Sequence, residues 1–480
     1  MSVGAFALYE PGHGLSPLTA HAPDLLRVVL GLALAFVAAV AAAHPFVRKV
    51  ERRLGLTVLL SSGLPFLAMG VVFHLPGVGV LTDDVVKDLR PVLEFGLGWL
   101  GFVVGTQFDV RELDAMPPKT GNVVVAESLI PFIAVAVACF VARVALDPYA
   151  TPEDFFTRRA YFFDTAGGDA LRDALALGAC AAPAAPVAAV AIARSAGSFA
   201  ASVVGRVTAL NDVAGVIVIG LICAYFRPGD AVSTWHLPHI AWLFVTFGMG
   251  GTLGILTYVL IRSARSAAEE IALLLGAIGI SAGMSGFLSI SPLVTCAIAG
   301  ALLTNLPHKQ SRRLRETIVQ VERPLYLIFL LVAGALWDPR DWQGWALVPI
   351  FVFARVMGKI LGAVVAKRTG PEGLPDAVTL GLALSPQSPI AIATIVSYVT
   401  LYRSLTTHAP IMSWLMTACI GGAVLTELVV QAVVRARGGL AFVDLRHPSM
   451  VMAPGQGSQD SLSDIGVTRS RFPTDPGVGR

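Results

Sequence analysis

The sequence predicts an all-α polytopic membrane protein of about 13 transmembrane helices, built as an inverted repeat with two broken, crossing helices. Three observations predict this fold: an apolar composition, a series of long apolar stretches, and proline pairs that recur in two of them. Of the 480 residues, 55% are hydrophobic and only 14% are charged, and the mean hydropathy is +0.72. Soluble domains carry about 25% charged residues. Lipid is therefore expected to surround most of the protein.

The apolar stretches divide the chain into three parts. A helix that crosses a bilayer needs roughly 20 mostly apolar residues. The stretches that meet this requirement are 25–43, 56–73, 92–109, 121–146, 174–193, 200–226, 238–261, 269–284, 288–304, 323–337, 343–366, 377–402 and 411–434. They define a transmembrane domain at 25–437, an external N-terminal segment at 1–24 and a tail at 438–480. The tail is rich in Gly, Ser, Pro and Asp, a composition typical of disorder.

The distribution of basic residues predicts the orientation. With the N-terminus outside, the connections and the tail on the cytoplasmic side carry most of the basic residues near span ends, as the positive-inside rule requires. The long connection at 147–173, which contains six acidic residues, is then external. We therefore expect a multi-pass protein of the cell inner (plasma) membrane with an external N-terminus and a cytoplasmic C-terminus.

Two short motifs each occur twice, seven predicted spans apart. The ends of the third and tenth spans, Gly105–Glu112 and Gly334–Asp341, share the order Gly, Asp, Arg and an acidic residue at the same spacing. The fifth and twelfth spans contain Pro183–Ala188 and Pro386–Ala391, which share two prolines three residues apart followed by Val or Ile and then Ala. An odd offset in spans inverts the second copy, so the sequence predicts an inverted repeat.

The proline pairs predict that both helices are broken. Pro183 and Pro186, like Pro386 and Pro389, remove backbone donors and clash with the preceding helical turn. Unwound backbone at membrane depth is tolerated only where protein or a water-filled cavity satisfies its polar groups. Broken helices in matching positions of two inverted halves indicate the substrate site of a secondary transporter. The alternative interpretation is two ordinary proline kinks.

Ionisable residues inside the predicted spans are candidates for the transport site, because they are costly there. Asp212 lies near the middle of the sixth span, and burial would let this carboxyl group hold either a proton or a metal ion. Lys359 lies near the middle of the eleventh span and could pair with Asp212 while no cation is bound. Arg355 is one turn away from Lys359, so one of the two needs an acidic partner, either Glu127 or Glu427. Purely structural ion pairing remains the alternative for each of these charges.

Four stretches together resemble the monovalent cation:proton antiporter-2 superfamily, which includes bacterial sodium/proton antiporters. They are Leu97–Leu113, Cys180–Gly215, Gly286–Leu303 and Gly358–Ala393. The resemblance implies an antiporter fold in which spans 4–6 and 11–13 form a transport core. It implies that spans 1–3 and 8–10 form a scaffold for a homodimer, with span 7 as the linker. It also implies that Asp212 binds the monovalent cation and that Lys359 occupies the core-lysine position of the family.

The chain departs from its relatives beside these residues. It has Asn211 before Asp212, the pair that the resemblance associates with electroneutral exchange, where electrogenic relatives have two aspartates. Relatives often place Ser, Thr or Asp beside the break in span 5, where this chain has Ala184 and Ala185. Backbone carbonyls or Thr208 are therefore expected to supply the missing cation ligands.

The predicted function is exchange of a monovalent cation for protons by competition at Asp212, with alternating access. Na⁺ is the first choice of cation, followed by Li⁺ or K⁺. The alternatives are an organic-anion carrier on a related inverted-repeat fold and a K⁺ efflux system. The sequence has no HExxH or GxSxG motif, so no enzymatic activity is predicted. No cofactor and no nucleic-acid partner are predicted either.

Overall fold

The computed structural model describes residues 63–75, 81–146, 165–226, 237–306, 311–402 and 409–436, together with residue 33. The predicted N-terminal segment 1–24, nearly all of the predicted first span and the predicted tail 438–480 lie outside the described residues.

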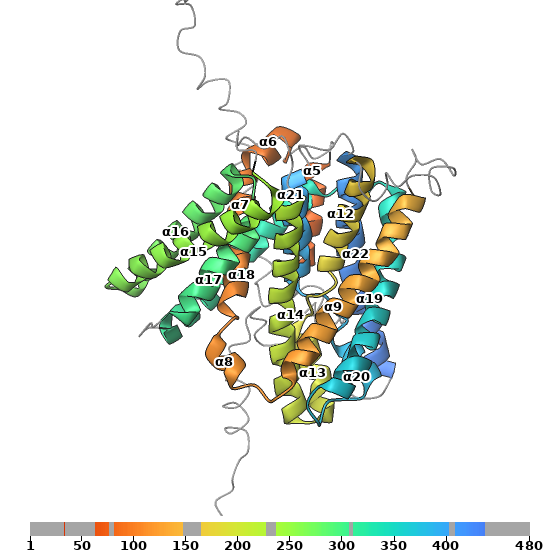
Figure 1. Ribbon diagram of the computed structural model, residues 1–480. Helices are drawn as coiled ribbons and strands as arrows, with labels where there is room; N and C mark the ends of the chain where they lie inside the picture. The colour runs from red at the N-terminus through yellow and green to blue at the C-terminus, as the bar shows by residue number, and fades with distance from the viewer. Residues whose placement is uncertain are drawn as a thin grey trace, which may run out of the picture.

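All regular structure in the described residues is helical (Figure 1). The helices are α5 (Leu64–His74), α6 (Asp83–Asp88), α7 (Arg90–Thr106), α8 (Val110–Asp114), α9 (Thr120–Ala145), α12 (Thr165–Ala179), α13 (Pro186–Ala193), the 3₁₀ helix η1 (Arg194–Ala196), α14 (Ser198–Tyr225), α15 (His239–Ser263), α16 (Ala267–Phe287), α17 (Pro292–Asn305), α18 (Ser311–Leu336), α19 (Trp342–Thr369), α20 (Ala377–Ala383), α21 (Pro389–Tyr402) and α22 (Ala409–Ala436).

The lengths and composition of these helices confirm a polytopic membrane protein. Six of the described helices, α9, α14, α15, α16, α19 and α22, are long and apolar enough to cross a bilayer. Shorter apolar helices occur in α5, α17, α18 and α21. The total of 13 spans stays a prediction, because part of the chain lies outside the described residues.

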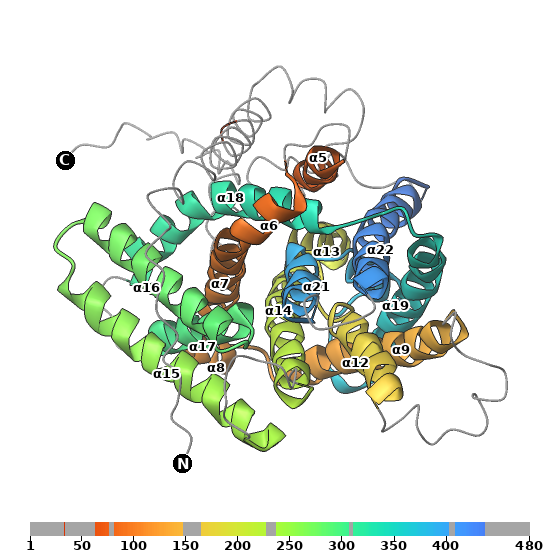
Figure 2. The same cartoon turned by 90° about the horizontal axis from the view of Figure 1, so that it is seen from above.

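The helices form two groups, which are seen side by side from above (Figure 2). The broken-helix group contains α9, α12, α13, α14 and α19–α22, and the flanking group contains α5, α7 and α15–α18. In the first group α9 packs along α19, and in the second α7 packs along α17 and α5 along α18. The two groups meet where α14 contacts α7, α15 and α17, and where α21 contacts α7 and α17.

The helix contacts repeat between the two halves of the chain, as an inverted repeat requires. The contact of α9 with α12 has its counterpart in α19 with α20, and the contact of α13 with α14 has its counterpart in α21 with α22. The repeated Gly–Asp–Arg motif also has one local structure. Asp109 Oδ1 accepts the backbone N–H of Arg111 at 2.9 Å, and Asp338 Oδ1 accepts that of Arg340 at 3.1 Å. Both copies therefore form the same aspartate turn just after a helix, α7 in the first copy and α18 in the second.

Both predicted helix breaks are present. The first separates α12, which ends at Ala179, from α13, which begins at Pro186. The second separates α20, which ends at Ala383, from α21, which begins at Pro389. Proline suits the first position of a helix, where its missing N–H would have no intrahelical partner. The breaks cross in contact, because the backbone N–H of Ala185 donates to the carbonyl of Pro386 at 2.8 Å.

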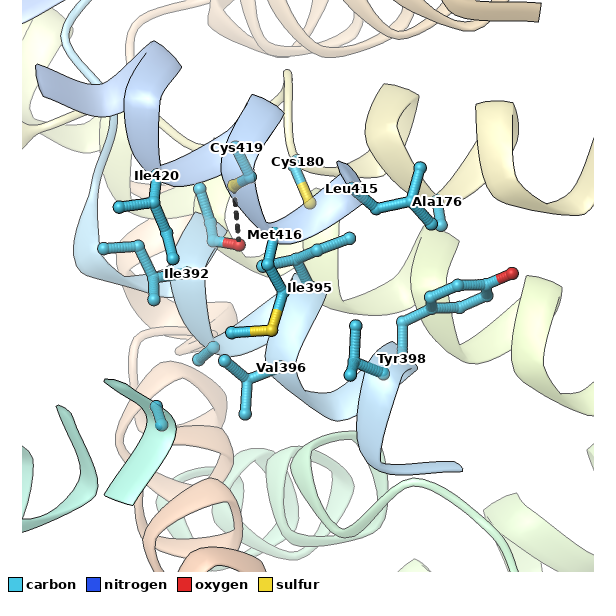
Figure 3. Close-up of a cluster of buried hydrophobic side chains, with 14 of the residues drawn as sticks. Ala176, Cys180, Ile392, Ile395, Val396, Tyr398, Leu415, Met416, Cys419 and Ile420 are labelled. Atoms are coloured by element: carbon cyan, nitrogen blue, oxygen red, sulfur yellow. Dashed lines mark hydrogen bonds between the residues drawn. The ribbon is translucent and has the colours of Figure 1, made fainter. Parts of the chain in front are cut away.

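Apolar packing beside the breaks holds the half-helices in place. Figure 3 shows Cys180, which directly follows α12, in one cluster with side chains of α12, α21 and α22, including Ala176, Ile395 and Met416. Cys419 belongs to it and donates its thiol to the carbonyl of Ala391 at 3.6 Å. These side chains have 0% exposure. The unwound segments are thus anchored on tightly packed helix ends.

Candidate functional site

The first break exposes four successive carbonyl groups, and two basic side chains of α19 bind all of them. Arg355 Nη1 donates to the carbonyls of Cys180 and Ala181 at 3.1 and 2.5 Å, and its Nη2 donates to that of Pro183 at 2.6 Å. Lys359 Nζ donates to the carbonyl of Ala182 at 2.9 Å. Both basic side chains have 0% exposure. The polar backbone that the prolines release at membrane depth is therefore satisfied by charged donors.

Arg355 also joins the two breaks. Its Nε donates to the carbonyl of Ser385 in the second break at 3.0 Å. The segments that Arg355 binds follow the C-terminal ends of α12 and α20, where a helix carries partial negative charge. The guanidinium therefore stabilises both half-helix ends while it fixes the distance between them.

Glu127 is the acidic neighbour of Lys359. Lys359 Nζ lies 3.9 Å from Glu127 Oε2 and donates to the backbone carbonyl of Glu127 at 2.8 Å. The Glu127 side chain has 0% exposure, and neither carboxylate oxygen accepts a hydrogen bond from the residues that the structure describes. Within the described chain, the ion pair of Lys359 is with Glu127 and not with Asp212. Of the two acidic partners considered from the sequence, Glu127 is the one beside this pair of basic residues.

Asp212 lies on α14 where the two breaks meet. Ser388, the residue before the first residue of α21, donates its hydroxyl to Asp212 Oδ1 at 2.7 Å. The Asp212 side chain is 4% exposed, and no basic group of the described residues lies within 4 Å of its carboxylate. The N-terminal end of α21, which carries partial positive charge, begins beside it. This carboxyl group is therefore buried and hydrogen-bonded, but it has no fixed counter-ion.

A glycine lets the first break approach α14 close to Asp212. A Cβ atom at Gly215 would lie 2.6 Å from Cγ of Pro183, which is closer than real Cβ contacts allow. Only the hydrogen atom of glycine leaves room for the proline ring at this level. Packing between the break and α14 therefore depends on this position.

The side chains of Asn211 and Thr208 engage other partners. Asn211 Oδ1 accepts the hydroxyl of Ser128 on α9 at 2.9 Å, and its Nδ2 has no hydrogen-bond partner among the described residues. The Thr208 hydroxyl donates to the carbonyl of Gly205 in its own helix at 2.8 Å. Both side chains have 0% exposure. In this conformation Thr208 does not direct its hydroxyl proton to Asp212.

A buried carboxylate without a counter-ion, beside two crossed helix breaks, can bind either a proton or a small cation. Comparison with protein families agrees with this chemistry, since residues 33–434 match the family described as sodium/hydrogen exchanger, transmembrane. The chain belongs to the sodium/hydrogen exchanger family. A comparison with curated proteins finds no match.

Membership of the sodium/hydrogen exchanger family gives the protein its general activity, cation/proton antiport across a membrane. The matched range includes Asp212, both breaks, Arg355 and Lys359. The resemblance to antiporters inferred from the sequence is confirmed at the level of this family.

Two serines of the candidate site were not identified from the sequence. Ser388 contacts Asp212, and Ser128 contacts Asn211. The signal for Ser388 was available in the repeat: aligned on their proline pairs, the two copies place Ser388 opposite Ala185. The second copy thus has a hydroxyl where the first has none. Ser128 carried no such signal, since nothing in the sequence indicates which face of α9 meets α14.

A second buried polar network in this exchanger joins the opposite ends of the half-helices. α12 begins at Thr165, so Arg172 and Asp173, expected in the external connection 147–173, lie inside a helix and are buried. Arg172 Nε donates to the Tyr398 hydroxyl at 2.5 Å, and the Tyr398 hydroxyl donates to Asp173 Oδ1. Arg143 Nε lies 3.8 Å from Asp173 Oδ2, and the Arg172 guanidinium lies 4.3 Å from the ring centroid of Tyr402. These contacts tie α9 and α12 of the first half to α21 of the second.

Proposed function

We propose that this family member exchanges Na⁺ for protons by competition at Asp212, with Li⁺ or K⁺ as the alternative cations. An ionised carboxylate inside the membrane is costly unless a positive charge accompanies it. Either a proton or a monovalent cation supplies that charge, and binding of one excludes the other. Alternating exposure of Asp212 to the two sides of the membrane then couples the two fluxes.

The observation that supports the proposal most is how the buried charges are distributed. Arg355 is engaged with break carbonyls, and Lys359 is engaged with two carbonyls and with Glu127. Asp212 accepts a hydrogen bond from neutral Ser388 and has no basic group within 4 Å among the described residues. Among these buried charges, the negative charge of Asp212 is therefore the one that an exchangeable proton or cation balances.

The same distribution supports one-for-one exchange. Asn211 does not titrate, so the centre offers a single carboxylate for cation and proton. Lys359 has its own carboxylate in Glu127, so cation binding at Asp212 does not remove its counter-ion. Lys359 then keeps its proton through the cycle, and each turnover moves equal charge in both directions. Transport is expected to generate no current.

The remaining assignments follow the family and the sequence. We place the chain in the monovalent cation:proton antiporter-2 branch, in the inner membrane of the cell with an external N-terminus. The broken-helix group serves as the transport core, and the flanking group serves as the scaffold of a homodimer. The protein acts as a carrier, without enzymatic chemistry and without a cofactor.

Exchange in proteoliposomes tests the assignment of Asp212. Vesicles with an imposed pH gradient are followed with a pH-sensitive dye, and Na⁺, Li⁺ or K⁺ is added outside. The wild-type protein is expected to dissipate the gradient, whereas Asp212→Asn, which removes the titrating group, is expected to give no response. Asp109→Asn is the matched control, because asparagine forms the same turn as aspartate at that position. Wild-type exchange by Asp212→Asn would show that the ion binds elsewhere.

A further inference from the structure

The side chain that is hydrogen-bonded to Asp212 comes from the opposite half of the repeat. Asp212 lies in the first half, on α14, and Ser388 lies in the second half, at the start of α21. The donor–acceptor distance of 2.7 Å is typical of a short hydroxyl–carboxylate bond. Ser388 is 2% exposed. A cation at Asp212 would therefore meet this hydroxyl oxygen as its nearest neutral ligand.

A hydroxyl group can interact with an exchange site both when a cation is bound and when it is absent. It has one proton to donate and two lone pairs that accept hydrogen bonds or bind a cation. In the structure Ser388 donates to Asp212 Oδ1, and its oxygen accepts the backbone N–H of Ile390 at 3.2 Å. One lone pair is thus left. Rotation of the hydroxyl proton away from Asp212 turns that lone pair toward a bound cation without moving any heavy atom.

The other groups expected as ligands have hydrogen-bond partners of their own, and none of the side chains among them is hydrogen-bonded to Asp212. The carbonyls of residues 180–183 accept from Arg355 and Lys359, and the Thr208 hydroxyl donates to Gly205. Ala184 and Ala185 bring no polar side chain to the first break. The hydroxyl that the first copy of the proline motif lacks is supplied by the second copy.

We propose that Ser388 is a direct cation ligand and sets the cation affinity of the site. The cation then binds at the seam between the inverted halves, held by a carboxylate from α14 and a hydroxyl from the second break. The inference rests on the proposed function of Asp212 and adds a residue from the other half of the molecule.

A capping role alone would also explain a serine here. Ser388 precedes Pro389 at the N-terminus of α21 and accepts the N–H of Ile390, as an N-cap residue does. The two roles separate on substitution with glycine. Glycine at an N-cap costs only a few tenths of a kcal/mol relative to serine, whereas alanine costs about 1 kcal/mol. Both substitutions remove the hydroxyl ligand equally.

The test is the cation dependence of exchange in proteoliposomes, measured as KM and kcat for Na⁺. Ser388→Ala and Ser388→Gly are both expected to raise KM about tenfold, with kcat within about twofold of wild type, because about 1.4 kcal/mol of binding is lost. Ser388→Thr keeps the hydroxyl and is expected to stay close to the wild-type KM. The matched control is Ser385→Ala in the same break, because the Ser385 hydroxyl donates to Gly381 and not to Asp212.

Each outcome separates the two roles. A raised KM for the alanine variant with a wild-type KM for the glycine variant would assign Ser388 to capping and overturn the proposal, as would an unchanged KM in both. If neither variant folds, Ser388→Cys keeps the size but replaces a hard oxygen by a soft sulfur, and the same rise in KM is expected. An unchanged KM for that variant overturns the proposal. Active Asp212→Asn would instead refute the site itself.

Discussion

Replacing Arg355 by alanine is expected to destabilise the whole broken-helix group. Four carbonyl groups of the two breaks accept hydrogen bonds from this guanidinium, those of Cys180, Ala181, Pro183 and Ser385. Only the Cys180 carbonyl has a further donor among the described residues, Gln387 Nε2 at 3.3 Å. Three buried acceptors therefore lose their partner at once.

The size of the effect follows from those three acceptors. Leaving a buried acceptor unsatisfied costs about 1–3 kcal/mol, so the Arg355→Ala variant loses about 3–9 kcal/mol. That is comparable with the total free energy of unfolding of many proteins, about 5–15 kcal/mol. We expect Arg355→Ala to give little monodisperse protein in detergent, or a thermal midpoint far below wild type. Arg355→Lys keeps a charged donor but not the planar fork, and we expect an intermediate loss.

The matched control for this measurement lies on the same helix. Arg368 is exposed near the C-terminal end of α19, and Arg368→Ala is expected to leave the thermal midpoint almost unchanged. Both variants remove one positive charge, so their difference isolates the carbonyl contacts. If Arg355→Ala and Arg368→Ala had the same thermal midpoint, the interpretation of Arg355 as the link between the breaks would be wrong.

Two further predictions concern packing around the half-helices. Tyr398→Phe removes the hydroxyl that joins Arg172 to Asp173. We expect this variant to lose about 1–3 kcal/mol of its free energy of unfolding and to keep the wild-type KM for Na⁺. A raised KM would instead place this network in the ion site. Gly215→Ala forces a Cβ against the Pro183 ring and is expected to cost about 1–3 kcal/mol. Gly248→Ala is its control, because a Cβ there has nothing within 4 Å, and equal melting of the two variants would contradict the close approach.

The sequence predicted the features that depend on residue type at one position. Proline pairs predicted both breaks because the missing N–H and the ring act locally, whatever packs around them. Asp212 was a candidate because an acidic residue is costly anywhere in an apolar span, and its presence there therefore indicates a function. Matching motifs seven spans apart predicted a repeat, and the helix contacts recur between the two halves of the chain.

The sequence did not predict contacts that depend on how helices cross. It left open whether Lys359 pairs with Asp212 or with an acid such as Glu127 or Glu427, and the crossing of α9 with α19 puts it beside Glu127. The sequence also did not show which groups accept hydrogen bonds from Arg355, because the backbone carbonyls of an unwound segment can belong to residues of any type. Low hydropathy placed Arg172 and Asp173 in a connection, although their mutual pairing and the ring of Tyr402 allow them to be buried. Hydropathy is assigned to each residue separately, so it does not detect charged residues that are buried as a pair.

Competition between a cation and a proton at Asp212 is tested most directly by equilibrium binding of radioactive sodium to the purified protein across a range of pH. If one proton displaces one cation, the apparent dissociation constant for sodium rises about tenfold for each unit by which the pH falls, in the acidic range where the carboxyl group is mostly protonated. Asp212→Asn should then bind no sodium at any pH. An affinity that does not depend on pH, or sodium binding that survives in Asp212→Asn, would contradict competition at this carboxylate.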